Sequence, residues 1–178
     1  MHFLNKYYNN NLKYEFINKF IYNKNIKIPK LKKIILNFGC KTADIKQLSS
    51  SLLAFELITS QKGKLSRTKN SNILFKIRKG NPTGCSVTLS KFNKFHFISK
   101  MIIEILPKLK IFLNFKQLKN LNQNTFSFKI KETFIFSELE EHYYLFNNLP
   151  TLDITIVTSS KSKNEMFFLL KSLKLPLL

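Results

Sequence analysis

Several residue types are scarce in this chain of 178 residues, and each scarcity narrows what the protein can be. Tryptophan is absent, glycine occurs four times and cysteine only twice. Cys40 and Cys85 lie far apart in the sequence and form no CxxC pair, which argues against a disulfide framework and against a cysteine-rich zinc site. Each cysteine follows a glycine in an apolar strand pattern. We therefore expect two buried, reduced thiols.

Acidic residues are also few. The chain has ten of them against thirty basic residues, so its formal net charge is +20. Only Arg67 and Arg78 are arginine, and the frequent Phe, Ile, Lys, Asn and Tyr have codons rich in A and T. An AT-biased genome accounts for part of the lysine content, but the shortage of acidic residues goes beyond such a bias. The remaining positive charge indicates a polyanionic partner.

Long apolar runs and catalytic patterns are missing as well. No stretch of about 20 apolar residues is present, so we expect no membrane span. The N-terminal MHFLNKYYNNNLKYEF has neither the apolar core of a signal peptide nor the composition of a transit peptide. No nucleophile with an adjacent base can be named, and GNPTG lacks the lysine–hydroxyl ending of a phosphate-binding loop. We expect a protein that is not an enzyme, has no cofactor or metal, and is made inside an organelle, namely a mitochondrion.

Hydrophobic periodicity predicts alternating helices and strands. Helical spacing covers residues 3–22, 45–59 and 92–106, and a last helix begins at the capping-box pattern Ser162…Glu165. Alternation predicts strands at 30–39, 126–131 and 152–157, and the polar run 113–124 predicts a long flexible loop.

The predicted strands have one apolar face and one basic or hydroxyl face. In residues 30–39, for example, Ile34, Leu36 and Phe38 alternate with Lys33 and Asn37. This pattern is typical of an antiparallel sheet with helices on one side and a partner on the other. We expect an α+β fold, a single domain over residues 1–178, mainly an antiparallel sheet packed against helices on one side.

Residues 75–89, FKIRKGNPTGCSVTL, form the most specific segment of the chain. Two of the four glycines flank Pro82, so GNPTG has a shaped backbone, and three basic residues precede it. Ser86 and Thr88 then alternate with apolar residues. Cations on a rigid turn beside a strand with hydroxyls suit a sugar–phosphate backbone.

This segment resembles the FKIRxGxPxGCxVTL signature of the ribosomal protein L5 family. Similar matches, in the family's order, occur at KYYNN near the start, IPKLKKIILNFG at 28–39, SQKGKLSRTK at 60–69, ETFIFSEL at 132–139 and LDITIVTSSKSKNE at 152–165. The resemblance implies a structural protein of the large ribosomal subunit. Such a protein binds 5S rRNA and large-subunit rRNA in the central protuberance, approaches the peptidyl-site tRNA, and contacts neighbouring proteins and a small-subunit head protein.

The resemblance also implies which residues bind RNA. The expected rRNA-binding residues are Lys30, Lys33, Asn37, Gln61, Lys62, Lys64, Lys76, Arg78 and Thr88. The expected tRNA-facing residues are Asn70, Ser71, Asn72, Lys79, Gly80, Asn81 and Pro82. Asn, Gln and Thr can pair with base edges or a 2′-hydroxyl, while lysines supply the salt-dependent part of the affinity.

For residues 70–84 the pattern and the resemblance differ. Alternation alone predicts a strand at 73–78 that pairs with 85–89, whereas the family implies a long loop projecting between two strands. We predict the loop, because Asn70, Ser71, Asn72 and GNPTG are poor strand residues. Phe75 and Ile77 would then pack within the loop or offer a stacking surface.

The chain also departs from the family. Gly63 replaces a proline, Ser86 a lysine, and Ser90–Lys91 an arginine–glycine pair, while the family's glycine-rich loop before the 126–131 strand has become lysine, asparagine and leucine. The last change alters the loop that the resemblance associates with the contact to the small-subunit head.

Two other functions remain open on sequence alone. A carrier of 5S rRNA or another structured RNA outside the ribosome would use the same surface but would not need the projecting loop. A protein that binds anionic lipids would need basic amphipathic helices, whereas here the lysines are spread over strands and loops.

Overall fold

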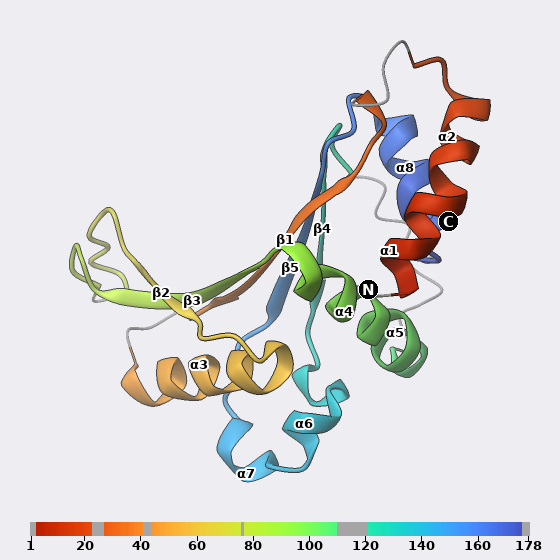
Figure 1. Ribbon diagram of the computed structural model, residues 1–178. Helices are drawn as coiled ribbons and strands as arrows, with labels where there is room; N and C mark the ends of the chain where they lie inside the picture. The colour runs from red at the N-terminus through yellow and green to blue at the C-terminus, as the bar shows by residue number, and fades with distance from the viewer. Residues whose placement is uncertain (1–2, 23–26, 41–43, 76, 110–120, 176–178) are drawn as a thin grey trace. The chain divides into compact units, whose positions relative to one another are not determined.

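The computed structural model of the chain is an α+β fold built on one five-stranded sheet (Figure 1). It describes residues 3–22, 27–40, 44–75, 77–109 and 121–175. The order of the strands is β2-β3-β1-β5-β4, and the sheet is antiparallel. The strands are β1 (Leu31–Gly39), β2 (Lys64–Arg67), β3 (Pro82–Leu89), β4 (Thr125–Ile130) and β5 (Leu152–Thr158).

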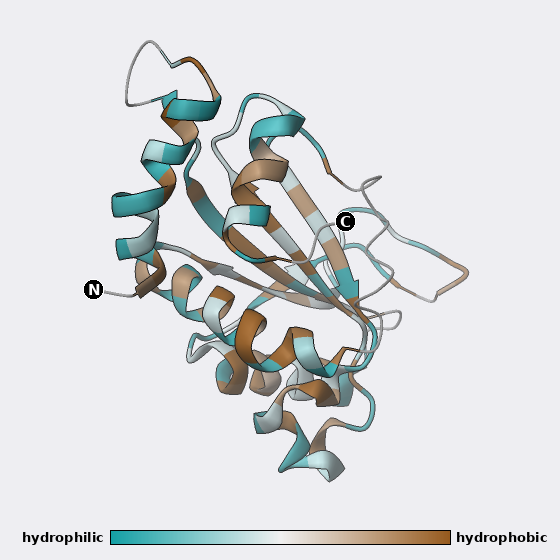
Figure 2. Ribbon diagram, turned by 90° about the vertical axis from the view of Figure 1, so that its right-hand side faces the viewer, coloured by the Kyte–Doolittle hydropathy of each residue, from teal (hydrophilic) through white to brown (hydrophobic). Residues whose placement is uncertain are grey.

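The alternation of apolar residues determines which face of each strand is buried. In β1, Ile34, Leu36 and Phe38 are fully buried, whereas Lys33 is exposed and Asn37 half-buried. β4 and β5 follow the same rule, and the alternation appears as brown and paler bands along the strands in Figure 2. The three strands predicted from alternation are therefore confirmed, each to within a residue of its ends.

The helices divide into long ones that periodicity predicts and short ones that it misses. The N-terminal helix consists of α1 (Phe3–Tyr7), a π-helical turn (Tyr8–Leu12) and α2 (Lys13–Lys19). It is followed by α3 (Ile45–Thr59), then by α4 (Lys91–Lys100), a π-helical turn (Met101–Ile105) and α5 (Leu106–Lys108), and finally by α8 (Lys163–Ser172). The missed elements are a 3₁₀ turn (Thr133–Ile135), α6 (Ser137–Glu140) and α7 (Tyr143–Phe146). No described helix is long and apolar enough to cross a membrane.

The contacts of the chain group into two compact units, and the first comprises residues 1–34, 89–127 and 155–178. Here α2 packs on α8 through Phe16 and Phe168, whose ring centroids are 4.9 Å apart in an edge-to-face arrangement. The capping box of α8 is present, because Ser162 accepts from the Glu165 amide and Glu165 accepts from the Ser162 amide. The tyrosine hydroxyl of Tyr22 also donates to Glu165 (3.2 Å), which ties the end of the N-terminal helix to α8.

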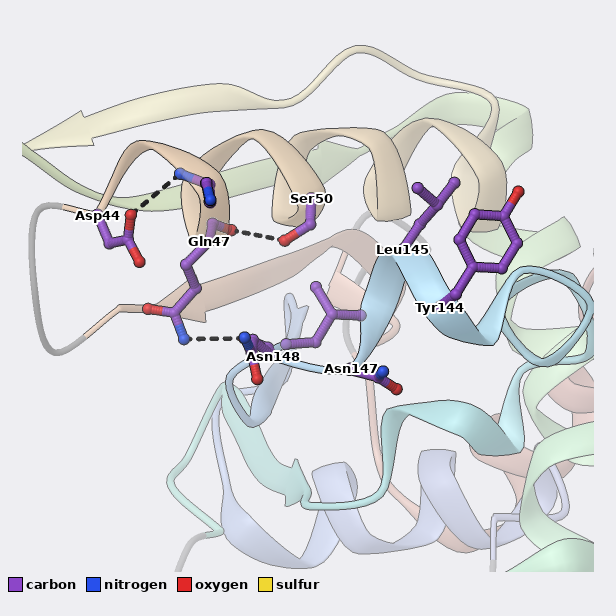
Figure 3. A pocket seen from close by; sticks show the side chains of 9 residues that line it. Asp44, Gln47, Ser50, Tyr144, Leu145, Asn147 and Asn148 are labelled. Atoms are coloured by element: carbon purple, nitrogen blue, oxygen red, sulfur yellow. Dashed lines mark hydrogen bonds between the residues drawn. The ribbon is translucent and has the colours of Figure 1, made fainter.

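The second unit comprises residues 35–88 and 128–154 and is layered. α3 lies between the β-strands on one side and α6 and α7 on the other, as Figures 1 and 3 both show. Phe38 of β1 and Phe55 of α3 join the first two layers, with ring centroids 4.5 Å apart. Asp44 caps the start of α3 through the Lys46 amide, and Ser60 ends it in the left-handed conformation (φ 53°).

The two cysteines lie in this unit as free, buried thiols, as the sequence predicts. The Sγ of Cys85 is 3.7 Å from the carbonyl oxygen of Leu48 in α3. Burial raises the pKa of the Cys85 thiol to about 11, and burial also raises the pKa of Cys40. Both thiols are therefore protonated and unreactive near neutral pH.

The segment between β2 and β3 is a projecting loop and not a strand, as we predicted against the simple alternation, but its bounds need correction. β3 begins at Pro82, so Pro82, Thr83 and Gly84 belong to the strand and the loop is 68–81. Proline is tolerated here because it is the first residue of the strand, opposite Arg67 at an irregularity in the register of edge strand β2. In GNPTG, Gly80 and Asn81 therefore end the loop, and Pro82 begins the strand.

Two other predicted features are altered or only partly described. Of the predicted 113–124 loop, residues 113–120 lie outside the described residues. Residues 121–124 make a tight turn into β4, in which the Asn122 amide donates to the Thr125 carbonyl (2.9 Å). Lys91, which replaces the family's glycine, begins α4 with a positive φ of 49°.

Candidate nucleic-acid interface

A row of polar side chains crosses the open face of three neighbouring strands. Lys64 of β2 is the partner of Ser86 of β3 in the antiparallel register. On the other side of β3, the Cys40 amide donates to the Thr83 carbonyl (2.9 Å). Continuing that antiparallel register into β1 places Asn37 opposite Ser86.

The burial of the same strands supports this register. Leu36 and Phe38 of β1 are buried, and so are Val87 and Cys85 of β3, which the register places opposite them. The row of Lys64, Ser86 and Asn37 therefore lies on the face that α3 does not cover. Thr88 lies on the same face of β3 as Ser86, two residues further along the strand.

The polar groups of this row are available to a partner. Neither Asn37, Lys64, Ser86 nor Thr88 makes a side-chain hydrogen bond within the part of the chain that the structure describes. Other hydroxyl groups of the protein do make hydrogen bonds within it. Ser51 bonds the carbonyl of Gln47 at 2.7 Å, for example. The open face therefore combines a cation, an amide and two hydroxyls that require hydrogen-bond partners, which is the mixture that RNA backbone and base edges satisfy.

Gln61 and Lys62 are held beside β2 by the end of α3. The Gln61 amide donates to the Thr59 hydroxyl (3.3 Å), directly after the left-handed Ser60. Gly63 follows in close contact with α3, because a Cβ there would lie 2.9 Å from the Leu52 side chain and 3.2 Å from Phe55. This packing fixes the path of the chain into β2, and Lys62 and Lys64 are both exposed.

The 68–81 loop is ordered by its own hydrogen bonds. Thr68 exchanges main-chain bonds with Asn81 and Gly80 at its base, and its hydroxyl donates to the carbonyl of Arg78 (2.9 Å). Further out, Asn72 and Ile77 form an isolated antiparallel bridge. Gly80 has a φ of +89°, which L side chains rarely adopt.

Apolar side chains occupy the tip of this loop. Ile73 and Leu74 are about nine-tenths exposed, and Phe75 is 54% exposed. The Leu74 amide donates to the side-chain Oδ1 of Asn72 (3.1 Å), and this bond closes the turn at the tip. Of the two alternatives for Phe75, the exposed ring favours a stacking surface over packing within the loop.

Acidic residues collect on a different surface of the second unit. Asp44, Glu56, Glu132, Glu138, Glu140 and Glu141 are six of the ten acidic residues of the chain, and they lie on or beside α3 and in the 132–141 segment. The only lysine or arginine of segments 44–59 and 132–149 is Lys46. Nucleic acid would be repelled there, whereas a cationic protein segment would be attracted.

A groove runs between α3 and α7 on this acidic side. Its volume is about 630 Å³, and Asp44, Gln47, Ser50, Tyr144 and Asn148 are among the residues that line it (Figure 3). The Gln47 amide donates to the Asn148 carbonyl (2.9 Å), which links the two walls. Tyr144 remains 73% exposed at the edge. Among the described residues, no group of His, Cys, Asp or Glu is arranged to hold a metal ion.

Comparison with known proteins identifies the family. The family model for the C-terminus of the ribosomal L5 family matches residues 82–177. A protein of Reclinomonas americana named large ribosomal subunit protein uL5m is 39% identical over 179 residues, which cover 99% of this chain and 98% of that relative. The chain belongs to the ribosomal L5 family.

Bacterial members of the L5 family are also similar. Large ribosomal subunit protein uL5 of Malacoplasma penetrans is 36% identical over 76% of this chain and 71% of its own length. The uL5 of Buchnera aphidicola is 34% identical over 75% of this chain and 74% of its own length. The L5 family is one of ribosomal proteins, and its role is structural and not enzymatic.

The residues that the L5 resemblance implies as RNA contacts lie in different parts of the structure. Asn37, Lys64 and Thr88 share the open face of the sheet, and Lys33 lies on the same face of β1 as Asn37. Arg78, in contrast, lies in the 68–81 loop beside the exposed Lys79, together with the residues expected to face tRNA. Lys30 precedes β1 and pairs through its main chain with Ser159, which leaves its side chain exposed. Lys76 lies outside the described residues.

The central member of the row is a residue that the sequence prediction omitted. The sequence marks Ser86 as a strand hydroxyl beside Thr88 and as a replacement of the family's lysine, but Ser86 is not among the expected RNA contacts. The signal that could have found it is its alternation with Thr88, which already placed both hydroxyls on one face of the strand.

Proposed function

We propose that the chain is a structural constituent of the large ribosomal subunit, in which residues 1–178 act as one RNA-binding domain. The observation that carries the proposal is the row of unpaired polar side chains on the open face of β2, β3 and β1. Lysine there would neutralise phosphates, while amide and hydroxyl groups would pair with sugars and base edges. The relatives' names supply the subunit.

We propose 5S rRNA of the central protuberance as the ligand of this face. Asn37, Gln61, Lys62 and Thr88, which the L5 resemblance implies as 5S contacts, lie on it or on the segment that leads into it. The open sheet face, free of helices from its own unit, suits a structured RNA whose shallow groove displays 2′-hydroxyls.

The 68–81 loop is proposed to approach the peptidyl-site tRNA. Its support is an ordered base, two exposed cations (Arg78 and Lys79) and an exposed aromatic ring at Phe75. A carrier of free 5S rRNA would have no need of such a loop, which favours the ribosomal function over that alternative.

The acidic surface at α3, α6 and α7 supports contact with proteins. A small-subunit head protein and neighbouring central-protuberance proteins are the proposed partners, and lysine-rich segments of such proteins would complement the glutamates of α6. The family's glycine-rich loop, which has changed in this chain, lies mostly outside the described residues. The structure therefore supports the proposed contact with the small subunit only through the α6–α7 surface.

A mitochondrial location is proposed from two observations. The composition indicates an AT-biased genome, and the relative named uL5m covers nearly the whole chain. We also propose that the protein is encoded and synthesised within the mitochondrion.

The test is to cross-link the protein to RNA in its native organelle and to sequence the attached RNA. We expect reads concentrated in a 5S-like RNA with a smaller tRNA signal. Reads confined to the large rRNA would retain the ribosomal function and remove 5S binding. If the protein sediments apart from large subunits while carrying a structured RNA, the carrier function replaces the ribosomal one.

A further inference from the structure

We propose that Ser86 is an additional RNA-binding residue and that its hydroxyl makes this face discriminate ribose from deoxyribose. The inference rests on the proposed function, because it concerns the same open face of the sheet. It names the feature of the ligand that is recognised, a 2′-hydroxyl, at a position where the family's lysine has been replaced by serine.

The position of Ser86 is the first step. It stands between Lys64 on one neighbouring strand and Asn37 on the other, and Thr88 lies two residues along β3 on the same face. Since neighbouring strands are about 4.8 Å apart, the row from Lys64 to Asn37 spans about 10 Å. A single bound nucleotide could therefore meet all three side chains.

The sheet surface beside Ser86 carries little side-chain bulk. Gly84 precedes it on the same face and is buried against β1, whereas Gly39 of β1, which the register places opposite Gly84, is exposed. A Cβ on Gly39 would have nothing within 4 Å, so the space over Gly39 is open. A sugar can thus approach the short side chain of serine, which a flat surface of long side chains would prevent.

The hydrogen-bonding capacity of Ser86 is the next step. Ser86 is half-buried, and its hydroxyl has no bonding partner among the described residues. A hydroxyl that loses its water on complex formation requires a replacement partner. A hydroxyl both donates and accepts, as a 2′-hydroxyl does, whereas a lysine ammonium only donates. Lys64 can hold the adjoining phosphate, which leaves the sugar to Ser86.

Replacing lysine by serine exchanges a salt-dependent contribution to RNA affinity for a hydrogen bond to the sugar. Each lysine–phosphate contact adds a salt-dependent contribution that does not distinguish RNA from DNA. With serine instead of lysine at position 86, this face has one cation fewer and gains a contact that only ribose can make. Selectivity for RNA should therefore be less sensitive to salt than the affinity itself.

The experiment measures binding of the full-length chain to a bacterial 5S rRNA transcript and to DNA of the same sequence. Wild type is compared with Ser86→Ala and Ser86→Lys over a range of salt concentrations. Ser49→Ala is the matched control, because Ser49 is an exposed serine on α3 and bonds only the Lys46 carbonyl. Thermal unfolding of each variant checks that the fold is retained.

We expect Ser86→Ala to lower RNA affinity by about threefold to tenfold, the usual size of one net hydrogen bond, and to leave DNA affinity and the salt slope unchanged. Ser86→Lys should steepen the salt slope by about 0.9 and reduce the preference for RNA. An RNA-to-DNA ratio in Ser86→Ala equal to that of wild type overturns the inference. If wild type binds an unrelated structured RNA as well as 5S rRNA, but Ser86 still sets the RNA-to-DNA ratio, the inference stands and the 5S function falls.

Discussion

Gly84 of β3 lies so close to Phe38 of β1 that a Cβ at position 84 would be 2.8 Å from the Phe38 carbonyl oxygen. Real Cβ atoms essentially never come so near a backbone oxygen, and neither backbone can move without disturbing the sheet. The glycine therefore sets the spacing of the two strands that present Ser86 and Asn37.

Gly84→Ala should accordingly destabilise the protein by about 1–3 kcal/mol, as other overpacked sites do. Chemical denaturation of the free protein measures this, and RNA binding should weaken in parallel because the row is distorted. Gly39→Ala is the control on the neighbouring strand, since its Cβ would meet nothing within 4 Å. Equal stability of the two variants would contradict the close approach.

Lys91 is expected to be strained. It holds a φ of 49° at the start of α4, a conformation that costs a residue with a Cβ about 1–2 kcal/mol and glycine almost nothing. Lys91→Gly should raise the free energy of unfolding by about 1 kcal/mol, while Lys91→Ala should not, because alanine keeps the Cβ. Both variants lose the charge, so both should reduce the salt slope of RNA binding by about 0.9 if Lys91 contacts a phosphate. A Lys91→Gly variant no more stable than Lys91→Ala would refute the strain.

The buried thiol of Cys85 predicts a loss of stability at alkaline pH. Its pKa is about 11 in the folded chain against an ordinary 9.0, so above pH 9 the unfolded chain releases the proton first. The unfolded state then binds fewer protons, and the free energy of unfolding falls with pH, by at most about 1.4 kcal/mol per unit, until the folded thiol also ionises.

The measurement compares wild type with Cys85→Ala by denaturation at about pH 8.5 and about pH 10.5, on either side of the window in which the unfolded thiol ionises. The stability advantage of wild type should shrink at the higher pH, because alanine has no proton to lose. In the same preparation, a thiol reagent near neutral pH should modify Cys40 and Cys85 slowly in the folded chain and rapidly in denaturant. An advantage that is constant with pH would mean that the thiol is not held protonated.

Arg78 is expected to contribute more than charge. Arg78→Ala should weaken RNA binding, and Arg78→Lys should keep the salt slope but recover only part of the affinity, because lysine lacks the planar bidentate guanidinium. Arg67, the other arginine of the chain, is exposed on edge strand β2 and provides the comparison. Unchanged affinity of Arg78→Ala in a binding assay with 5S rRNA would remove Arg78 from the site.

Sequence reasoning predicted the long elements and missed the short ones, for physical reasons. α3 and β1 have enough periodic residues to show one buried face, and α8 has a capping box as well. The Thr133–Ile135 turn, α6 and α7 have three or four residues each, too few for a helical period to appear. β2 was hidden for a related reason, since it is an edge strand whose residues are mostly exposed.

The candidate site was predictable in its members but not in its arrangement. Asn37 and Thr88 came from the L5 resemblance, yet only the pairing of β2, β3 and β1 shows that Ser86 lies between them. Arg78 was grouped with these residues as an rRNA contact although the predicted 70–84 loop already contained it, and the hydrogen bond from Thr68 agrees with that loop position. Such relations depend on register between segments distant in the sequence, which local patterns do not encode.

The segregation of acidic from basic residues makes the second unit an electric dipole. The glutamates of the 132–141 segment lie beyond α3, on the side away from the ribbon that carries Lys62, Lys64 and Arg78 (Figure 1). In the field of a polyanion such a dipole experiences a torque before any contact forms. The field of an approaching RNA would therefore tend to turn the basic side of this unit toward it.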